Sequence, residues 1–135
     1  MPSGKSIIGR NLAILLDTHA LVWVGIGDPR LSEAARNAIL DPDQQVLISA
    51  VTAYEFVDLN RRGRFGADLP FAEIATQLGA SIMDYPAACS VIAGLLPLLH
   101  LDPVDRMLIA FAVHSDLPIV TADATIRQYP VRVIW

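Results

Sequence analysis

Four acidic residues stand where a parallel α/β fold would bring them together. Asp17 ends the apolar run LAILL, and Asp123 follows the run LPIVT in the triplet TAD. Glu55 and Asp105 each lie near the start of a segment with a helical pattern. Because ligands of open α/β sheets bind beyond the carboxyl ends of the strands, we expect these four carboxylates to face one rim of the sheet.

Carboxylates that converge in this way need a partner that removes their repulsion. Two of them ~5 Å apart repel by about 3 kcal/mol at an effective dielectric constant of ~20. Protonation relieves that repulsion, and so does a divalent cation. Oxygen ligands without a Cys or His cluster favour Mg²⁺ or Mn²⁺ over zinc. The chemistry typical of such a centre is phosphoryl transfer, in which metal ions activate water and stabilise the leaving oxygen.

Each of these acids also has a structural explanation, and the residues alone leave both open. Asp17 and Asp123 could cap the helices that follow them. Glu55 stands three residues after Thr52, which is the spacing of a capping box. Asp105 lies in the first turn of a helix that begins at a DP pair, where the helix dipole favours an acid.

The elements that must position these residues alternate along the chain. Continuous apolar runs, typical of strands covered on both faces, lie at residues 12–16, 45–49, 81–83, 117–121 and 131–135. Helical patterns lie between them, at residues 18–25, 32–40, 50–62, 71–78, 86–96, 104–115 and 123–128. Ser32 and Thr52 are the expected N-caps of the second and third helices, and Gly63 is the residue expected just after the third. The alternation predicts an α/β sandwich of three layers around a parallel sheet.

Length and composition agree with one folded domain. The chain has 135 residues, of which 53% are hydrophobic and 18% charged, and this excludes a disordered protein. We expect a short N-terminal extension at residues 1–11 and the domain at residues 12–135. The formal net charge of −4 excludes a general basic field for nucleic acid. A single cysteine excludes an intrachain disulfide, and without a signal peptide or a membrane-length apolar run we expect a cytoplasmic protein.

Other acidic or phosphate-binding α/β classes lack residues that they require. A receiver-type signalling domain needs a lysine near its last strand, and no lysine follows Lys5. A haloacid-dehalogenase-like phosphatase needs Asp-x-Asp after the first strand, where this chain has Asp17-Thr18-His19. A P-loop enzyme needs GxxxxGK[ST], which is absent from the sequence.

Four segments together resemble the PIN-domain family, and in particular the VapC-type toxin ribonucleases of bacterial toxin–antitoxin pairs. They are LLDTHALVW at 15–23, ISAVTAYEF at 48–56, LDPVDRMLIAFA at 101–112 and IVTAD at 119–123. The similarity runs from about Leu12 to Trp135. It implies a five-stranded parallel sheet in the order 3-2-1-4-5.

The resemblance also implies an activity and partners. It implies an endoribonuclease that depends on Mg²⁺ or Mn²⁺, is inhibited by a cognate antitoxin and forms a homodimer. By motif, Asp17, Glu55, Asp105 and Asp123 correspond to the catalytic and metal-binding acids. The chain departs from the family pattern at Tyr54, where a tryptophan is frequent, and at Leu101, where a basic or polar residue is frequent. The alternative is a non-catalytic PIN-like module that binds RNA or protein, which the presence of all four acids disfavours.

Several further residues have two interpretations. Arg61, Arg62 and Arg64 are candidate RNA contacts that could neutralise phosphates, or they form an ordinary solvated helix end. Arg106 is expected either to orient a carboxylate of the site or to form a surface ion pair. Other expectations concern hydroxyls near the metal (Thr18, Thr121), structural histidines (His19, His100, His114) and core or interface positions (Trp23, Met83, Met107, Phe111).

Overall fold

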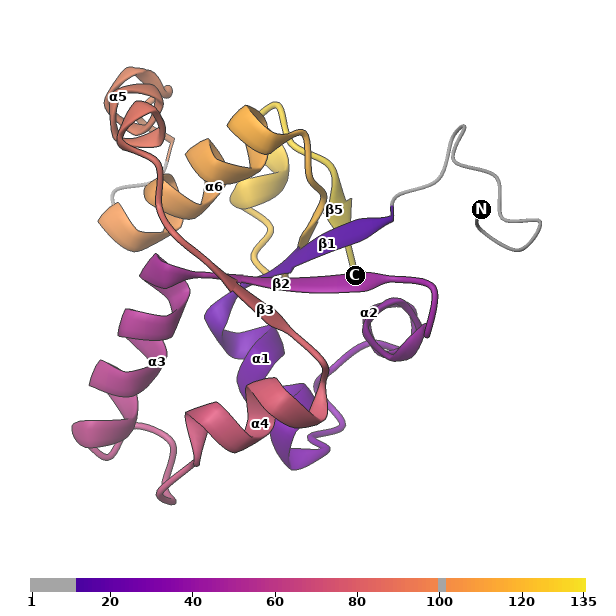
Figure 1. The fold of residues 1–135 in the computed structure, drawn as a ribbon. Helices are drawn as coiled ribbons and strands as arrows, with labels where there is room; N and C mark the ends of the chain where they lie inside the picture. The colour runs from indigo at the N-terminus through magenta and orange to yellow at the C-terminus, as the bar shows by residue number, and fades with distance from the viewer. Residues whose placement is uncertain (1–11, 100–101) are drawn as a thin grey trace.

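A central parallel sheet organises the computed structural model, which describes residues 12–99 and 102–135 (Figure 1). The sheet has five strands in the order β3-β2-β1-β4-β5. They are β1 (Ala13–Leu16), β2 (Gln45–Ser49), β3 (Ser81–Met83), β4 (Ile119–Val120) and β5 (Val133–Ile134). All four neighbouring pairs are parallel, so the predicted fold class and strand order are confirmed. The predicted extension at residues 1–11 and His100 lie outside the described residues.

Helices cover both faces of this sheet. They are α1 (Thr18–Ile26), α2 (Glu33–Leu40), α3 (Ala50–Arg61), α4 (Phe71–Gln77), α5 (Ala87–Leu95) and α6 (Pro103–Ser115), followed by a short 3₁₀ helix, η1 (Ile126–Gln128). In the view of Figure 1, α1 to α4 lie below the sheet, and α5 and α6 lie above it. None of the helices in the described part of the chain combines the length and the apolar character needed to cross a membrane.

The alternation of side chains in β1 divides the core into two halves. Ile14 and Leu16 belong to the cluster formed with α1 to α4. Leu15 belongs to the cluster formed with α5, α6 and η1. All three side chains are 0% exposed. This burial on both faces explains why the strand has a continuous apolar sequence instead of an alternating one.

Short polar side chains determine where the helices begin. Ser32 caps α2, as expected, by accepting the N–H of Ala35 at 3.1 Å. The expected cap of α3 at Thr52 is wrong, because Ser49 accepts the N–H of Val51 at 3.2 Å. The helix begins at Ala50, as predicted, and Thr52 is buried within its first turn.

The C-terminal elements are shorter than the sequence pattern predicts. β4 begins only at Ile119, because the N–H of Leu117 donates to the Ala112 carbonyl at the end of α6 (2.9 Å). The helix predicted at 123–128 is also wrong in its first half. Asp123 accepts the N–H of Thr125 at 2.8 Å in a local turn, and only the 3₁₀ helix η1 follows.

Candidate active site

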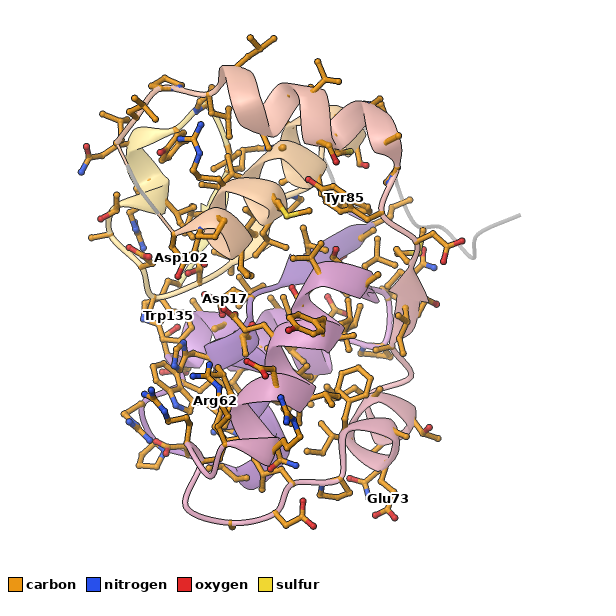
Figure 2. All side chains as sticks on the ribbon, turned by 90° about the vertical axis from the view of Figure 1, so that its left-hand side faces the viewer. Asp17, Arg62, Glu73, Tyr85, Asp102 and Trp135 are labelled. Atoms are coloured by element: carbon orange, nitrogen blue, oxygen red, sulfur yellow. The ribbon has the colours of Figure 1, made fainter. Side chains whose placement is uncertain are left out.

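A cavity of about 340 Å³ lies where β1 and β4 end and where α1 and α6 begin. We call it the acidic cavity; it is lined by Asp17, Thr18, His19, Trp23, Glu55, Asp102, Asp105, Ala122 and Asp123. All four acids singled out from the sequence lie in its wall. Figure 2 shows Asp17 and Asp102 on one face of the molecule.

Asp17 is held at the end of β1 by both its backbone and its side chain. Its N–H donates to the Val120 carbonyl at 3.2 Å, which ties it to the neighbouring strand β4. Its carboxylate accepts the N–H of Ala20 at 2.8 Å and thereby caps α1. The structural explanation offered by the sequence is therefore correct for Asp17, and the same carboxylate also faces the acidic cavity.

The surroundings of Asp17 act on its ionisation in opposite directions. Burial raises the pKa of its carboxyl above the ordinary value of 3.8. Hydrogen bonds from the Thr121 hydroxyl and the Ala20 N–H lower it, as does the nearby His19, while the charge of Asp123 raises it. The net effect is a raised pKa, so folding opposes ionisation of this group.

Glu55 reaches the acidic cavity from the second turn of α3. Its carboxylate accepts a hydrogen bond from the Thr18 hydroxyl, which links the start of α1 to α3 across 37 residues of sequence. Thr18 and Thr121, expected as hydroxyls near the metal, thus bind the carboxylates of Glu55 and Asp17. Two neutral hydroxyls thereby fix two of the four acids at the cavity.

The start of α6 supplies two more acids to the wall. Asp102 caps the helix, accepting the N–H groups of Val104 at 2.9 Å and Asp105 at 3.2 Å. Pro103 occupies the first helical position, where its missing N–H costs nothing. Asp105 lies in the same first turn, so its position is fixed by a cap that another residue provides.

Arg106, the neighbour of Asp105, serves the end of a different helix. Its guanidinium donates to the carbonyl oxygens of Ala93 (2.7 Å), Leu96 (3.1 Å) and Pro97 (2.8 Å). These carbonyls close the C-terminal end of α5, where backbone acceptors lack helical partners. Arg106 therefore fastens α6 to α5 and supports the position of Asp105.

Asp123 enters the acidic cavity from the turn after β4. Its N–H donates to the Thr121 hydroxyl at 3.0 Å, and its carboxylate accepts the N–H of Thr125 at 2.8 Å. Thr121 thus connects Asp123 with Asp17 through its single hydroxyl. Hydrogen bonds to one hydroxyl thus link the two acids that follow the adjacent strands β1 and β4.

The donor set fits a hard divalent cation in the type of ligand atom. Every acidic side chain in the acidic cavity offers oxygen, which suits Mg²⁺ and Mn²⁺. The raised pKa of Asp17 reflects burial and a like charge, and a cation would relieve both. Within residues 12–99 and 102–135, however, no three His, Cys, Asp or Glu side chains converge as a ready-made set of ligands. The acids share one cavity and do not yet close around a common point.

The three arginines considered as RNA contacts are not equivalent. Arg61 and Arg62 both form ion pairs with Asp58, at 3.0 Å each. Arg64 instead lines a different cavity, beside the acidic one. Figure 2 shows Arg62 on the same face as Asp17. The structure therefore separates Arg64 from its two neighbours.

Sequence reasoning missed three residues of the acidic cavity wall. Asp102 entered the prediction only as part of the DP pair that begins a helix, His19 as a structural histidine and Trp23 as a core or interface position. The signal for the last two was their spacing: positions four apart in α1, starting two residues after Asp17, lie on one helix face. Their rings are 5.7 Å apart between centroids, and Trp23 also lies 5.7 Å from Trp135.

A comparison with protein families identifies this arrangement. The PIN domain model matches residues 14–131, which is most of the chain. The chain belongs to the PIN domain family. The resemblance predicted from the four sequence segments, to this family and to its VapC-type members, is confirmed.

Individual relatives of this PIN domain cover nearly its whole length. Ribonuclease VapC22 of Mycobacterium tuberculosis is 29% identical over 119 residues, which cover 86% of this chain and 91% of the relative. The structure of VapBC2 from Rickettsia felis bound to a DNA fragment from their promoter has a TM-score of 0.66 at 16% identity, covering 90% of this chain and 96% of that one. DNA-bound VapBC from Salmonella typhimurium has a TM-score of 0.65 at 19% identity, with the same coverage. The two structures show that the fold is shared.

Proposed function

We propose that this PIN domain is an endoribonuclease that requires Mg²⁺ or Mn²⁺ and acts as the toxin of a toxin–antitoxin pair. The observation that carries the proposal is the gathering of Asp17, Glu55, Asp105 and Asp123 in one cavity. The similarity to a protein named Ribonuclease VapC22 supports RNA as the substrate. The fold shared with VapBC structures supports a partner protein that inhibits the enzyme.

In this proposal the four acids would hold the cation and the chain's other groups would orient them. The Thr18 hydroxyl keeps the Glu55 carboxylate in place, and the Thr121 hydroxyl does so for Asp17. A bound Mg²⁺ or Mn²⁺ would offset the negative charge of the phosphodiester and lower the pKa of an attacking water. Without a cation the same acids repel both one another and the RNA backbone, which explains why catalysis would need the metal.

The proposed partners need surfaces that the fold leaves open. Large apolar side chains are exposed on α5 and in the loop after it: Val91 (65%), Leu95 (81%) and Leu98 (78%). Exposed apolar surface of this kind is typical of protein interfaces. It supports the predicted homodimer or the antitoxin contact, and action in the cytoplasm stays a prediction.

Cleavage of RNA by the purified chain tests this proposal. We expect a single-stranded RNA to be cut when Mg²⁺ or Mn²⁺ is present and to stay intact when EDTA is present. Cleavage that persists in EDTA would contradict the metal mechanism, and better activity with Zn²⁺ than with Mn²⁺ would contradict the oxygen-ligand argument. Tight RNA binding without cleavage under any metal would instead support the alternative, a non-catalytic binding module.

A further inference from the structure

A second cavity of about 360 Å³ adjoins the acidic cavity. It is lined by His19, Val22, Trp23, Ile26, Arg30, Leu59, Arg64 and Phe65, and we call it the aromatic cavity. His19 and Trp23 line both cavities, so the two share a wall on α1. The two cavities therefore meet at the same two side chains of α1.

The turn that carries Arg64 is built rigidly. The N–H of Arg64 donates to the Leu59 carbonyl at 3.0 Å, and Gly63 before it has a φ of 73°, a conformation that favours glycine. Phe65 packs against the buried Phe56, with 5.1 Å between ring centroids. Arg64 therefore projects from a backbone that is fixed on both sides.

Asn60 closes the same loop from the other end. Its side-chain amide donates to the Asp68 carboxylate at 2.9 Å, and its carbonyl oxygen accepts the N–H of Leu69 at 2.9 Å. Hydrogen bonds thus hold the segment between Asn60 and Leu69 at both ends, and the conformational entropy of this segment is already lost when the chain folds. A ligand of Arg64 would meet a turn that is already organised.

Arg64 differs from the arginines around it in its ion pairing. Arg30, the other arginine of the aromatic cavity, is paired with Asp28 through two contacts, at 2.8 and 3.1 Å. Its guanidinium carbon also lies 4.9 Å from the ring centroid of Trp23. Arg64 forms no ion pair with any residue in the described ranges 12–99 and 102–135. The positive charge of the aromatic cavity is therefore carried by Arg64.

We propose that the aromatic cavity binds the RNA strand next to the cleaved phosphodiester and that Arg64 contacts a backbone phosphate there. The inference rests on the proposed ribonuclease function and deepens it. A chain with a net charge of −4 and an acidic catalytic cavity needs local positive charge to hold a polyanion. Aromatic and apolar walls beside such a charge are typical of sites for single-stranded nucleic acid.

Binding of a fluorescein-labelled single-stranded RNA of mixed sequence, followed by fluorescence polarisation, tests the proposal. The measurement uses the full chain with Asp105→Asn, so that the probe is not consumed. Arg64→Ala added to this background should weaken binding about tenfold, the loss expected for a charge-assisted contact. It should also reduce the slope of log affinity against log salt by about 0.7, as expected for one phosphate contact on a single strand.

Two further variants separate this contact from a general charge effect. Arg64→Lys should recover most of the affinity, because it keeps the charge. Arg61→Ala removes the same charge from an arginine already paired with Asp58, and it should cost less than about twofold. Equal losses for Arg61→Ala and Arg64→Ala, or no loss for Arg64→Ala, would overturn the proposal.

The proposed function is read separately, from cleavage of RNA by the wild-type chain with Mn²⁺. If the wild-type chain cleaves RNA and Arg64→Ala binds RNA as tightly as its parent, the proposed ribonuclease function is supported and the proposed role of the aromatic cavity is overturned. An antitoxin-derived peptide that loses affinity for Arg64→Ala while the RNA does not would assign the cavity to protein binding, which would also overturn the proposal.

Discussion

The helix starts of α1 and α6 place acids at the same cavity by different means. At α1 a single carboxylate, Asp17, both caps the helix and faces the acidic cavity. At α6 both Asp102 and Asp105 line the acidic cavity, but Asp102 accepts the N–H groups of Val104 and Asp105, whereas Asp105 is the acid proposed to bind the metal. At α1 one residue therefore has both the capping role and the proposed catalytic role, whereas at α6 the two roles belong to different residues.

The difference shows how helix capping can bring acids to a catalytic site. A cap stabilises a helix start by about 1 kcal/mol, whichever chemistry the carboxylate also performs. The position of Asp17 is therefore explained by folding alone, and its role in catalysis needs independent evidence. The start of α6 is capped by Asp102, so substitution of Asp105 leaves these capping hydrogen bonds in place.

The largest effect is expected at α6. Asp105→Asn should reduce RNA cleavage by at least about 100-fold, because an amide is a poor ligand for a hard cation. Even the substitution of a residue that only supports a metal ligand reduces metal affinity or activity by roughly 10–100-fold. The free energy of unfolding without metal should fall by well under ~1 kcal/mol. Cleavage rates and urea unfolding curves of the same preparations measure both. An active Asp105→Asn variant would remove Asp105 from the site.

At α1 the prediction concerns the sign of a stability change. Asp17→Asn keeps a side chain that caps well but removes a partly buried carboxylate whose ionisation the fold opposes. In EDTA near pH 7 the variant should therefore be more stable than the wild type, by ~1–2 kcal/mol, and RNA cleavage should be lost. If Asp17 served only as a favourable charge at a helix start, the variant would be less stable, and unfolding in EDTA distinguishes the two outcomes.

The same carboxyl predicts a dependence on pH. Its pKa in the folded chain is raised above the ordinary value of 3.8, so the folded state holds its proton more tightly than the unfolded state does. The contribution of Asp17 to stability is then greatest at low pH and is lost as the pH rises from 3.8 through the raised pKa. The advantage of Asp17→Asn over the wild type in EDTA should accordingly grow between about pH 4 and pH 7. An advantage that shrinks over this range would contradict the raised pKa.

The smallest effects are expected from the cap of α6. Asp102→Ala should lower the free energy of unfolding by about 1 kcal/mol, whereas Asp102→Asn, which keeps an acceptor for the N–H groups, should lower it by only a few tenths. Thermal unfolding of the two variants side by side measures the difference. Equal losses would show that Asp102 acts through its charge and that the two tasks are not divided at α6.

The rule that strands end at a shared rim made most of the site predictable from sequence. It placed Asp17 and Asp123 correctly because β1 and β4 are adjacent parallel strands with apolar sequences. The hydrogen bond between Thr18 and Glu55 was not predictable, since it depends on how α1 packs against α3. The same holds for the aromatic cavity, which joins α1 with the loop after α3.

Two of the errors, at Thr52 and at Asp123, arose where the same kind of side-chain hydrogen bond could serve two local structures. Ser49 and Thr52 are both residue types that cap helices, and the sequence does not show which of them is the N-cap of α3. At Asp123 a carboxylate that starts a helix and one that closes a turn accept the same kind of N–H group. Residue type alone does not decide such cases, because each of these side chains can accept an N–H in either structure.

Binding of Mn²⁺ to the purified chain tests most directly whether the acids of the acidic cavity act together as a metal centre. The wild-type chain should take up Mn²⁺ in a calorimetric titration and unfold at a higher temperature, with about 2.7 kcal/mol of added stability at a metal concentration 100 times the dissociation constant. Asp105→Asn should bind far more weakly and gain little stability. Equal Mn²⁺ binding by the two proteins, or no binding by the wild type, would contradict a metal centre built from these carboxylates.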